Sequence, residues 1–231
     1  MAGVAGGPSI PRLSGGNNEV SQGYESRLAP NFGVVGEYTF TEHLSLLAEV
    51  DFSGQGGVRK GMQPITQSPA GLPPLPEGQY LYGDFKNESI LNYLEIPVMI
   101  KYRRNFAEQW NWFAEAGPFV GFLLEAKEKT SGTSEIYVDK DGTMPLAVEG
   151  QPLPPQSFDQ TTDVKSDLHK FNWGVTGGVG ISYLATKNSQ IILDARGEYG
   201  LREVQRNTER DGSSHTGNAV FSIGYLYNFG L

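Results

Sequence analysis

Two residues have the spacing that hydrolytic chemistry needs: His43 and Ser45 form a His-x-Ser motif. A His acts as general base for a Ser hydroxyl when the two side chains meet and an acid orients the imidazole. The sequence puts His43 in a tight turn and Ser45 on the polar face of the strand that follows. A turn histidine is the simpler interpretation, and we predict no catalytic residue.

Metal-binding residue types are too few and too scattered to form a site. The chain of 231 residues has no Cys, which excludes a thiolate zinc site, a cysteine nucleophile and a disulfide framework. The other histidines, His169 and His215, lie in or near long irregular segments. Three scattered His residues do not make a zinc site. We therefore predict no metal site and no cofactor.

Two glycine-containing segments resemble binding loops but do not complete one. Asp139-Lys-Asp-Gly-Thr143 is similar to a calcium loop, but aligning Gly142 with the required glycine puts Val148 at the bidentate acid position. Gly174–Gly180 is rich in glycine, yet the helix that a phosphate loop needs does not follow it. We interpret the first segment as a turn and the second as part of a crowded or curved strand.

The overall composition excludes further classes of protein. The 26 Asp and Glu exceed the 18 Lys and Arg, and the net charge is −8. Such a chain lacks the basic face that nucleic acid requires, so no nucleic-acid partner is expected. No apolar run approaches the ~18 residues of a membrane-spanning helix. Mean hydropathy is below zero, which taken alone indicates a soluble protein.

Alternation of apolar and polar residues with a period of two recurs along the chain and predicts strands, whereas helical periodicity is scarce. The pattern predicts eight strands, the first of them diluted by Gly and Pro8. They cover residues 2–10, 31–41, 43–53, 91–104, 110–126, 170–185, 189–202 and 217–231.

The connections between these strands alternate in length. Short turns lie near 41–43, 105–109 and 186–188, whereas the other connections are long. This alternation is typical of an antiparallel up-and-down transmembrane β-barrel of a bacterial outer membrane, with short periplasmic turns and long extracellular loops. We predict an all-β fold with one eight-stranded barrel domain over residues 1–231 and both termini in the periplasm. The long loops are expected near 11–30, 54–90, 127–169 and 203–216.

The start of the chain bears on its compartment. Met1–Ala5 lacks the basic region and the apolar region of a signal peptide. This leaves either a cytosolic protein or a mature or trimmed chain that carries an added Met.

Each predicted strand has one apolar face without charge, the first strand excepted. The strand at 91–104, for example, sets Leu94, Ile96 and Val98 against Glu95 and Lys101. A lipid-facing Lys or Arg would cost about 2–4 kcal/mol at mid-bilayer, so an uncharged face is expected in a membrane. A soluble barrel with its apolar face inward is the alternative.

Aromatic residues gather near both ends of the strands, as they do at the two interfaces of a bilayer. This predicted aromatic girdle comprises Tyr38, Phe40, Tyr102, Trp110, Trp112, Phe171, Trp173, Tyr183, Tyr199, Tyr227 and Phe229.

Several of these segments resemble one known family. Asn92-Tyr-Leu-Glu-Ile-Pro-Val-Met-Ile-Lys-Tyr102 and Phe113-Ala-Glu-Ala-Gly-Pro-Phe-Val-Gly121 are similar to central strands of the PorT-like outer-membrane β-barrel family of Bacteroidota. Asp194–Leu201 and Ile223–Phe229 are similar to its last two strands. The resemblance implies an eight-stranded outer-membrane barrel made with a signal peptide. The family is mostly of unknown function, and its namesake is tied to type IX secretion. The chain departs from many outer-membrane barrels by ending in Leu231 rather than in an aromatic residue.

The polar faces predict a charged lumen. An eight-stranded barrel is just wide enough for side chains, so a diffusion pore is not expected. Unpaired charge is costly in a closed interior, and we expect the charges to pair across strands with Lys101 and Arg196 as counter-ions. A proton or ion relay is the alternative. The predicted network comprises Glu37, Glu49, Asp51, Glu95, Lys101, Glu115, Asp194, Arg196 and Glu198, and Arg103, Glu125 and Arg202 also have inward parity.

The long loops are the other place where function can lie. Two of them hold proline-rich stretches, Pro69–Pro76 and Pro152–Pro155, which are stiff and suited to docking a partner. The expected partners are outer-membrane lipid and lipopolysaccharide, and a protein bound through the loops or the lipid-facing wall. Three hypotheses stand: a non-enzymatic structural or partner-binding subunit of an envelope complex, a membrane-embedded lipid-modifying enzyme, and a small channel.

Overall fold

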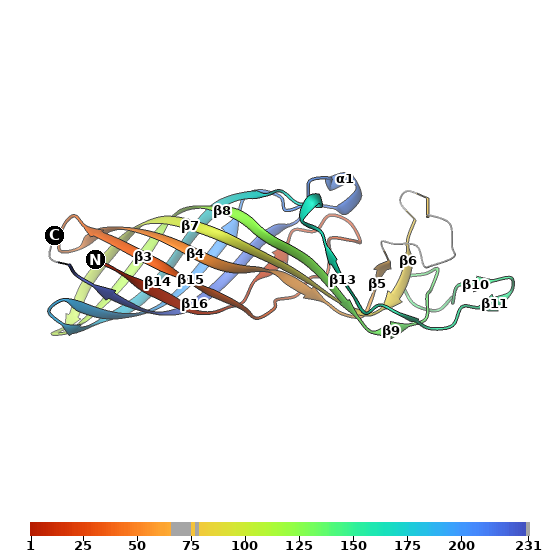
Figure 1. The fold of residues 1–231 in the computed structure, drawn as a ribbon, viewed down its shortest axis with the longest axis horizontal. Helices are drawn as coiled ribbons and strands as arrows, with labels where there is room; N and C mark the ends of the chain where they lie inside the picture. The colour runs from red at the N-terminus through yellow and green to blue at the C-terminus, as the bar shows by residue number, and fades with distance from the viewer. Residues whose placement is uncertain (66–74, 77–78, 230–231) are drawn as a thin grey trace.

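A closed antiparallel barrel dominates the computed structural model, which describes residues 1–65, 75–76 and 79–229 (Figure 1). Within those residues eight strands form a ring, because the first strand pairs with the last, with Ala2 opposite Tyr227. Each ring strand pairs antiparallel with its neighbours, as an up-and-down barrel requires. In order around the ring they are β1 (Ala2–Ser9), β3 (Ala29–Thr39), β4 (Leu44–Arg59), β7 (Lys86–Ala107), β8 (Trp110–Ser131), β14 (Phe171–Thr186), β15 (Ser189–Gly200) and β16 (His215–Tyr227).

All eight predicted strands are present, and the predicted fold class is confirmed. Three strands are longer than the alternation indicated: β4 continues to Arg59, β7 begins at Lys86 and β8 continues to Ser131. These extensions pair with one another, with Arg59 opposite Asn87 and Lys86 opposite Ser131. They continue past the part of the wall that has an apolar face, and their polar sequence concealed them. The connections are correspondingly shorter than 54–90 and 127–169.

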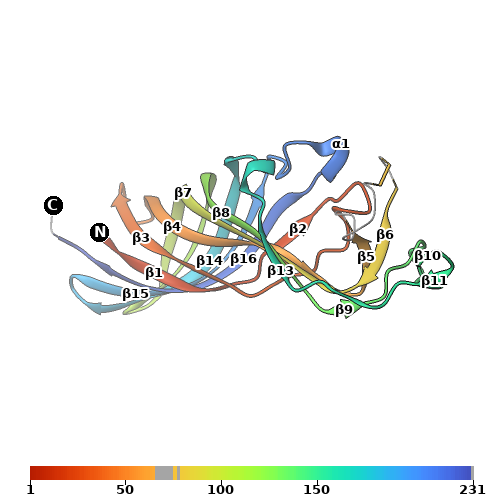
Figure 2. The same cartoon turned by 45° about the vertical axis from the view of Figure 1, so that its right-hand side comes forward.

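The long connections carry further structure at the end of the barrel away from the termini (Figures 1 and 2). In the first connection, β2 (Arg12–Ser14) pairs with β16. In the third, β13 (Gln160–Asp163) pairs with β8. The other short elements are β5 (Met62–Ile65) with β6 (Leu81–Asp84), β9 (Thr133–Ser134) with β12 (Gln156–Ser157), β10 (Ala147–Val148) with β11 (Gln151–Pro152), the 3-10 helix η1 (Lys165–Asp167) and the short helix α1 (Thr208–Asp211).

Two sequence interpretations fall partly outside the described residues. Most of the Pro69–Pro76 stretch lies there, with Leu75 and Pro76 the exceptions. The strand predicted over 217–231 begins at His215 and ends at Tyr227, and Leu231 is also outside the described part.

The two faces of the barrel wall differ as the alternation predicts. Outward Val34, Val179 and Ile223 are 55%, 62% and 59% exposed, whereas inward Leu47 and Met99 are buried. A soluble barrel would turn its large apolar residues inward, so this wall is built to face lipid. Among the described residues, no helix has the length and apolar character needed to cross a bilayer.

Glycine on the inner face makes room for the side chains that fill the lumen. A Cβ at Gly180 would lie 2.3 Å from the ring atom Cζ of Phe113 on the neighbouring strand β8. Gly180 therefore lets an aromatic ring occupy a narrow barrel, in agreement with the crowding interpretation of Gly174–Gly180.

Candidate functional site

Buried apolar side chains cluster in the lumen at two levels. Two clusters lie along the inner face of β7. Tyr93 belongs to the upper cluster, on the side of the long connections, and Met99 belongs to the lower cluster, on the side of the chain termini. The charged Glu95 lies between them. The upper cluster consists of Leu13, Leu91, Tyr93, Leu123, Ala126, Leu168 and Val204. The lower cluster consists of Val35, Leu47, Met99, Phe113, Ile192 and Leu226. The upper cluster includes residues from three long connections, so those connections help to close the mouth.

The Arg196 group is the centre of the charged layer. Its guanidinium binds Glu49 with two donors, Nη1 to Oε2 at 2.8 Å and Nη2 to Oε1 at 3.4 Å. Nη2 also donates to Asp194 Oδ2 at 3.1 Å. Glu115 is farther away, with its Oε1 3.7 Å from Arg196 Nε and no hydrogen bond between them. One base therefore serves three carboxylates from three strands.

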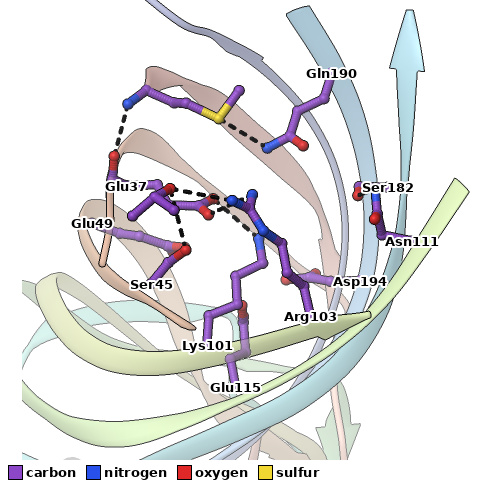
Figure 3. Close-up of polar contacts among 12 residues, drawn as sticks. Glu37, Ser45, Glu49, Lys101, Arg103, Asn111, Glu115, Ser182, Gln190 and Asp194 are labelled. Atoms are coloured by element: carbon purple, nitrogen blue, oxygen red, sulfur yellow. Dashed lines mark hydrogen bonds and ion pairs between the residues drawn. The ribbon is translucent and has the colours of Figure 1, made fainter. Parts of the chain in front are cut away.

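The Lys101 group lies nearer the termini, where Figure 3 shows its side chains pointing toward one another. Lys101 Nζ and Arg103 Nη1 each lie 3.3 Å from a different oxygen of the buried Glu37 carboxylate. Lys101 Nζ also lies 4.0 Å from the centroid of the Phe113 ring, a cation–π arrangement. Two bases here share one acid, the reverse of the Arg196 group.

Two further carboxylates, Glu95 and Glu198, rely on amide donors. Gln55 Nε2 donates to Glu95 Oε1 at 3.3 Å and to Glu198 Oε2 at 3.5 Å, and Asn218 Nδ2 donates to Glu198 at 3.1 Å. Asp51 is also buried, and in the described part of the chain no ion pair joins Asp51, Glu95 or Glu198 to a base. Gln55 lies beyond the strand end predicted at residue 53, so alternation did not place it in the lumen. Asn218 lies within a predicted strand and has inward parity, so alternation could have identified Asn218.

One residue of inward parity, Glu125, lies outside the lumen. β8 has one extra residue opposite Asn92 and Tyr93, and this β-bulge reverses the facing of the residues beyond it. Glu125 therefore faces outward, with its side chain 42% exposed, and pairs with Lys127 at 2.5 Å. Arg202 follows the end of β15 at Gly200 and is not part of either charged group. The inward prediction for Glu125 was wrong.

The candidate chemical motifs do not assemble. His43 is exposed in its turn, whereas the neighbouring Ser45 is buried in the lumen, where its hydroxyl donates to Thr39 at 3.4 Å. His169 and His215 each contact a backbone carbonyl at 3.1 Å. Across residues 1–65, 75–76 and 79–229, no three His, Asp or Glu residues are grouped to hold a metal ion.

The Asp139 segment forms a turn. Its carboxylate accepts hydrogen bonds from the Thr143 and Met144 backbone N–H groups at 3.1 and 2.7 Å, and Gly142 has φ +68°. Burial alone would raise the pKa of Asp139, but these donors lower it below its usual value. The oxygens that a calcium loop would use are therefore engaged in the turn.

The aromatic residues predicted for the girdle form pairs on the outer wall. Near the short turns, Trp110 packs against Tyr183 with ring centroids 4.9 Å apart, and Tyr102 packs against Trp112 at 5.7 Å. Other pairs near the short turns are Tyr38 with Phe40 and Tyr227 with Phe229. Toward the long connections, Phe171 packs against Phe122 and Tyr199 against His215, while Trp173 is exposed on the same wall.

A closed barrel with an apolar outer wall, paired wall aromatics and a lumen filled by charged and apolar side chains defines an outer-membrane β-barrel protein. The sequence agrees: residues 1–206 match the family of the outer membrane protein beta-barrel domain. The chain therefore belongs to that family. Its place is therefore the bacterial outer membrane.

Solved structures similar to this chain are also barrels of bacterial outer membranes, and no curated protein sequence matches it. Neisserial surface protein A is 13% identical, with a TM-score of 0.45 over 99% of this chain and 97% of that one. OprG from Pseudomonas aeruginosa is 9% identical, with a TM-score of 0.42 over 98% and 92%. Ail of Yersinia pestis is 15% identical, with a TM-score of 0.37 over 98% and 96%. Identities this low concern the fold alone, and nothing about function is drawn from them.

Proposed function

We propose that this protein is a non-catalytic membrane anchor that presents an extracellular lobe to a partner protein. The observation that carries the proposal is a contrast within the molecule: the lumen is plugged, whereas β4, β7 and β8 continue beyond the barrel into a lobe with its own apolar cluster. That cluster consists of Ile65, Leu81, Phe85 and Ile136, with Leu75, Leu146 and Phe158 packed against it. A chain that only needed to span the membrane would not require an apolar core outside the barrel.

The lobe is held together as a folded unit rather than as separate loops. Phe85 and Phe158 stack with ring centroids 4.4 Å apart and planes 7° from parallel. Tyr82 of β6 donates its hydroxyl to Glu19 of the first connection at 2.6 Å. Partial burial and this carboxylate raise the pKa of Tyr82 to about 12, so the donor keeps its proton at neutral pH. Such ties give a partner a surface of fixed shape.

The tip of the lobe has the character of a docking surface. Val138, Met144 and Val148 are 45%, 55% and 40% exposed there, next to the stiff Pro152–Pro155 stretch. The tip and the two chain ends lie at opposite ends of the molecule (Figure 1). Short turns face the periplasm in barrels of this kind, so we place both termini in the periplasm and the lobe outside.

Two finer assignments belong to the same proposal. The Tyr93-Leu-Glu-Ile-Pro97 run supports a PorT-like member of the family in Bacteroidota, and a role in an envelope complex, including type IX secretion, rests on that resemblance alone. Lipopolysaccharide and lipid are the expected neighbours of the apolar wall. Neither a lipid-modifying active site nor a conducting lumen has a supporting observation among the described residues.

Capture from native outer membranes in mild detergent tests the docking surface. The tagged wild-type protein is expected to retain one partner in fixed stoichiometry, and the variant Val138→Ser/Met144→Ser/Val148→Ser is expected to lose it. Leu28→Ser is the matched control, because Leu28 is 74% exposed but lies in the first connection, away from the tip. Equal retention by all three proteins, or retention by none, would count against the tip as the docking surface.

Planar-bilayer recordings test the closed lumen. The wild-type barrel is expected to pass no steady ion current, because two apolar clusters and an ion-paired layer fill its interior. Heat-modifiable migration of the recovered protein provides the control that it was folded in the membrane. Stepwise conductance from folded protein would overturn the anchor in favour of a small channel.

A further inference from the structure

The lobe contains a pocket that the docking proposal does not use. It holds about 90 Å³ of space on the inner side of the strand extensions. Five parts of the chain meet there: the first connection, β4 with β5, β7, β8 and β13 with the residues before it. Its lining includes Tyr24, Arg59, Ile65, Asn87, Glu128 and Phe158.

Arg59 supplies a cation without an acidic partner. Its Nη1 donates to the backbone carbonyl of Glu19 at 2.7 Å, which fixes the guanidinium against the first connection. Among the described residues, no carboxylate lies within ion-pair distance of it. Partial burial lowers the pKa of Arg59, although the side chain stays charged at neutral pH. An acceptor that enters the pocket therefore meets free N–H donors.

Asn87 supplies an acceptor without a donor. Its Nδ2 donates to Glu128 Oε1 and lies 3.5 Å from the Tyr24 hydroxyl. A carboxylate only accepts, so the amide nitrogen must face Glu128 and the amide oxygen must face away from it. That oxygen, Asn87 Oδ1, is buried and has no hydrogen-bond partner in the described structure. A buried acceptor left alone costs free energy that a bound donor would recover.

Glu128 supplies the opposite charge. Burial raises the pKa of the Tyr24 phenol, and the nearby Glu128 carboxylate raises it further. Within the described part of the chain Glu128 has no base at ion-pair distance. One pocket thus presents an unmatched cation, an unmatched anion and an unmatched acceptor beside an apolar wall of Ile65, Phe85 and Phe158.

We propose that this pocket binds a small zwitterion with an apolar side chain, of the chemical class of a free aliphatic amino acid. The ammonium group is received by Glu128 and Asn87 Oδ1, the carboxylate by Arg59, and the side chain by the apolar wall. A neutral sugar would bond the polar atoms but leave both charges unmatched in a half-buried site. A zwitterion neutralises both at once.

The binding step is independent of the docking surface. Only the source of the ligand, outside the cell, rests on the orientation proposed above. The tip variant Val138→Ser/Met144→Ser/Val148→Ser is therefore expected to keep full ligand affinity, which separates failure of one proposal from failure of the other.

Calorimetric titration of the folded, detergent-solubilised full chain with L-leucine tests the pocket. Saturable binding at one site is expected. Isopentylamine, which lacks the carboxylate, and 4-methylpentanoate, which lacks the ammonium group, are each expected to bind about tenfold to a hundredfold more weakly, because each loses a charge-assisted contact. Absence of leucine binding up to its solubility would overturn the proposal, and so would binding of glucose in its place.

Two variants assign the contacts. Arg59→Gln and Glu128→Gln are each expected to weaken leucine binding by about tenfold to a hundredfold. Glu128→Gln keeps an oxygen for Asn87 Nδ2, so the fold of the pocket is preserved. Lys129→Gln is the matched control, since Lys129 adjoins Glu128 on β8 but does not line the pocket, and it should bind leucine as wild type does. Unchanged affinity in both pocket variants would place leucine elsewhere on the protein.

Discussion

Arg196→Ala is expected to lower the free energy of unfolding of the barrel by about 3–5 kcal/mol, the usual cost of removing one partner from a buried ionic group. The Arg196 side chain is only 4% exposed and binds Glu49 through both terminal nitrogens and Asp194 through one of them. Its loss leaves the carboxylates of Glu49, Asp194 and Glu115 facing one another without the arginine that pairs with them. Chemical unfolding in lipid vesicles, followed by tryptophan fluorescence, measures the change.

Two controls make that result specific. Arg206→Ala removes an exposed arginine whose Nη1 bonds the backbone carbonyl of Ser166 at 3.2 Å, and it is expected to change stability by less than about 0.5 kcal/mol. Adding Glu49→Gln to Arg196→Ala removes one of the stranded charges and is expected to recover part of the loss. If Arg196→Ala were as stable as the wild type, the charged lumen would not be an interaction network at all.

The membrane-spanning half of the fold is readable from the sequence because alternation has a physical cause on both faces. Lipid excludes charge from one parity, and a narrow lumen admits polar and small residues on the other. Val179 and Ile223 were therefore assigned to the correct face from parity alone, as were Glu95 and Arg196. The pairing of Asn92 with Glu125 and of Tyr93 with Leu123 shows the limit, since one extra residue on β8 reverses the parity and the residue types do not predict it.

Which charged side chains pair inside the lumen depends on the register and stagger of the strands. The alternation of apolar and polar residues does not predict either of these. Lys101 and Arg196 were expected as counter-ions, without assigned partners. Arg196 pairs with Glu49, Asp194 and Glu115, Lys101 binds Glu37, and Glu95 bonds Gln55 instead of a base. Which inward residues share a level follows from the tilt of the strands around the ring. That tilt is a property of the closed barrel and not of any one strand.

The lobe could not be predicted from periodicity because its strands have no lipid face. Arg59, Asn87 and Glu128 lie on strand extensions whose sequence reads as polar loop. Their contacts with Tyr24 join positions far apart in the chain. Only the paired backbone of β4, β7 and β8 brings them together.

Val179→Arg is expected to cost about 2–4 kcal/mol of unfolding free energy in lipid vesicles. Val179 is the most suitable position because it lies on β14 between Trp173 and Tyr183, which belong to the two opposite girdle regions, and so sits near mid-bilayer. Val138→Arg is the matched control: Val138 is also an exposed valine, but on the lobe, where water solvates the new charge and the expected change is below about 0.5 kcal/mol.

The comparison of the two valines separates lipid from water as the medium around the wall. In a soluble barrel both residues would face water, and an arginine at either would change stability little and equally. In a bilayer the guanidinium at position 179 must leave water or deform the lipid around it, whereas the one at position 138 need not. A difference of at least about 1.5 kcal/mol between the variants is therefore the expected signature of a lipid-facing wall. Equal, small losses would require the apolar wall to be covered by something other than lipid.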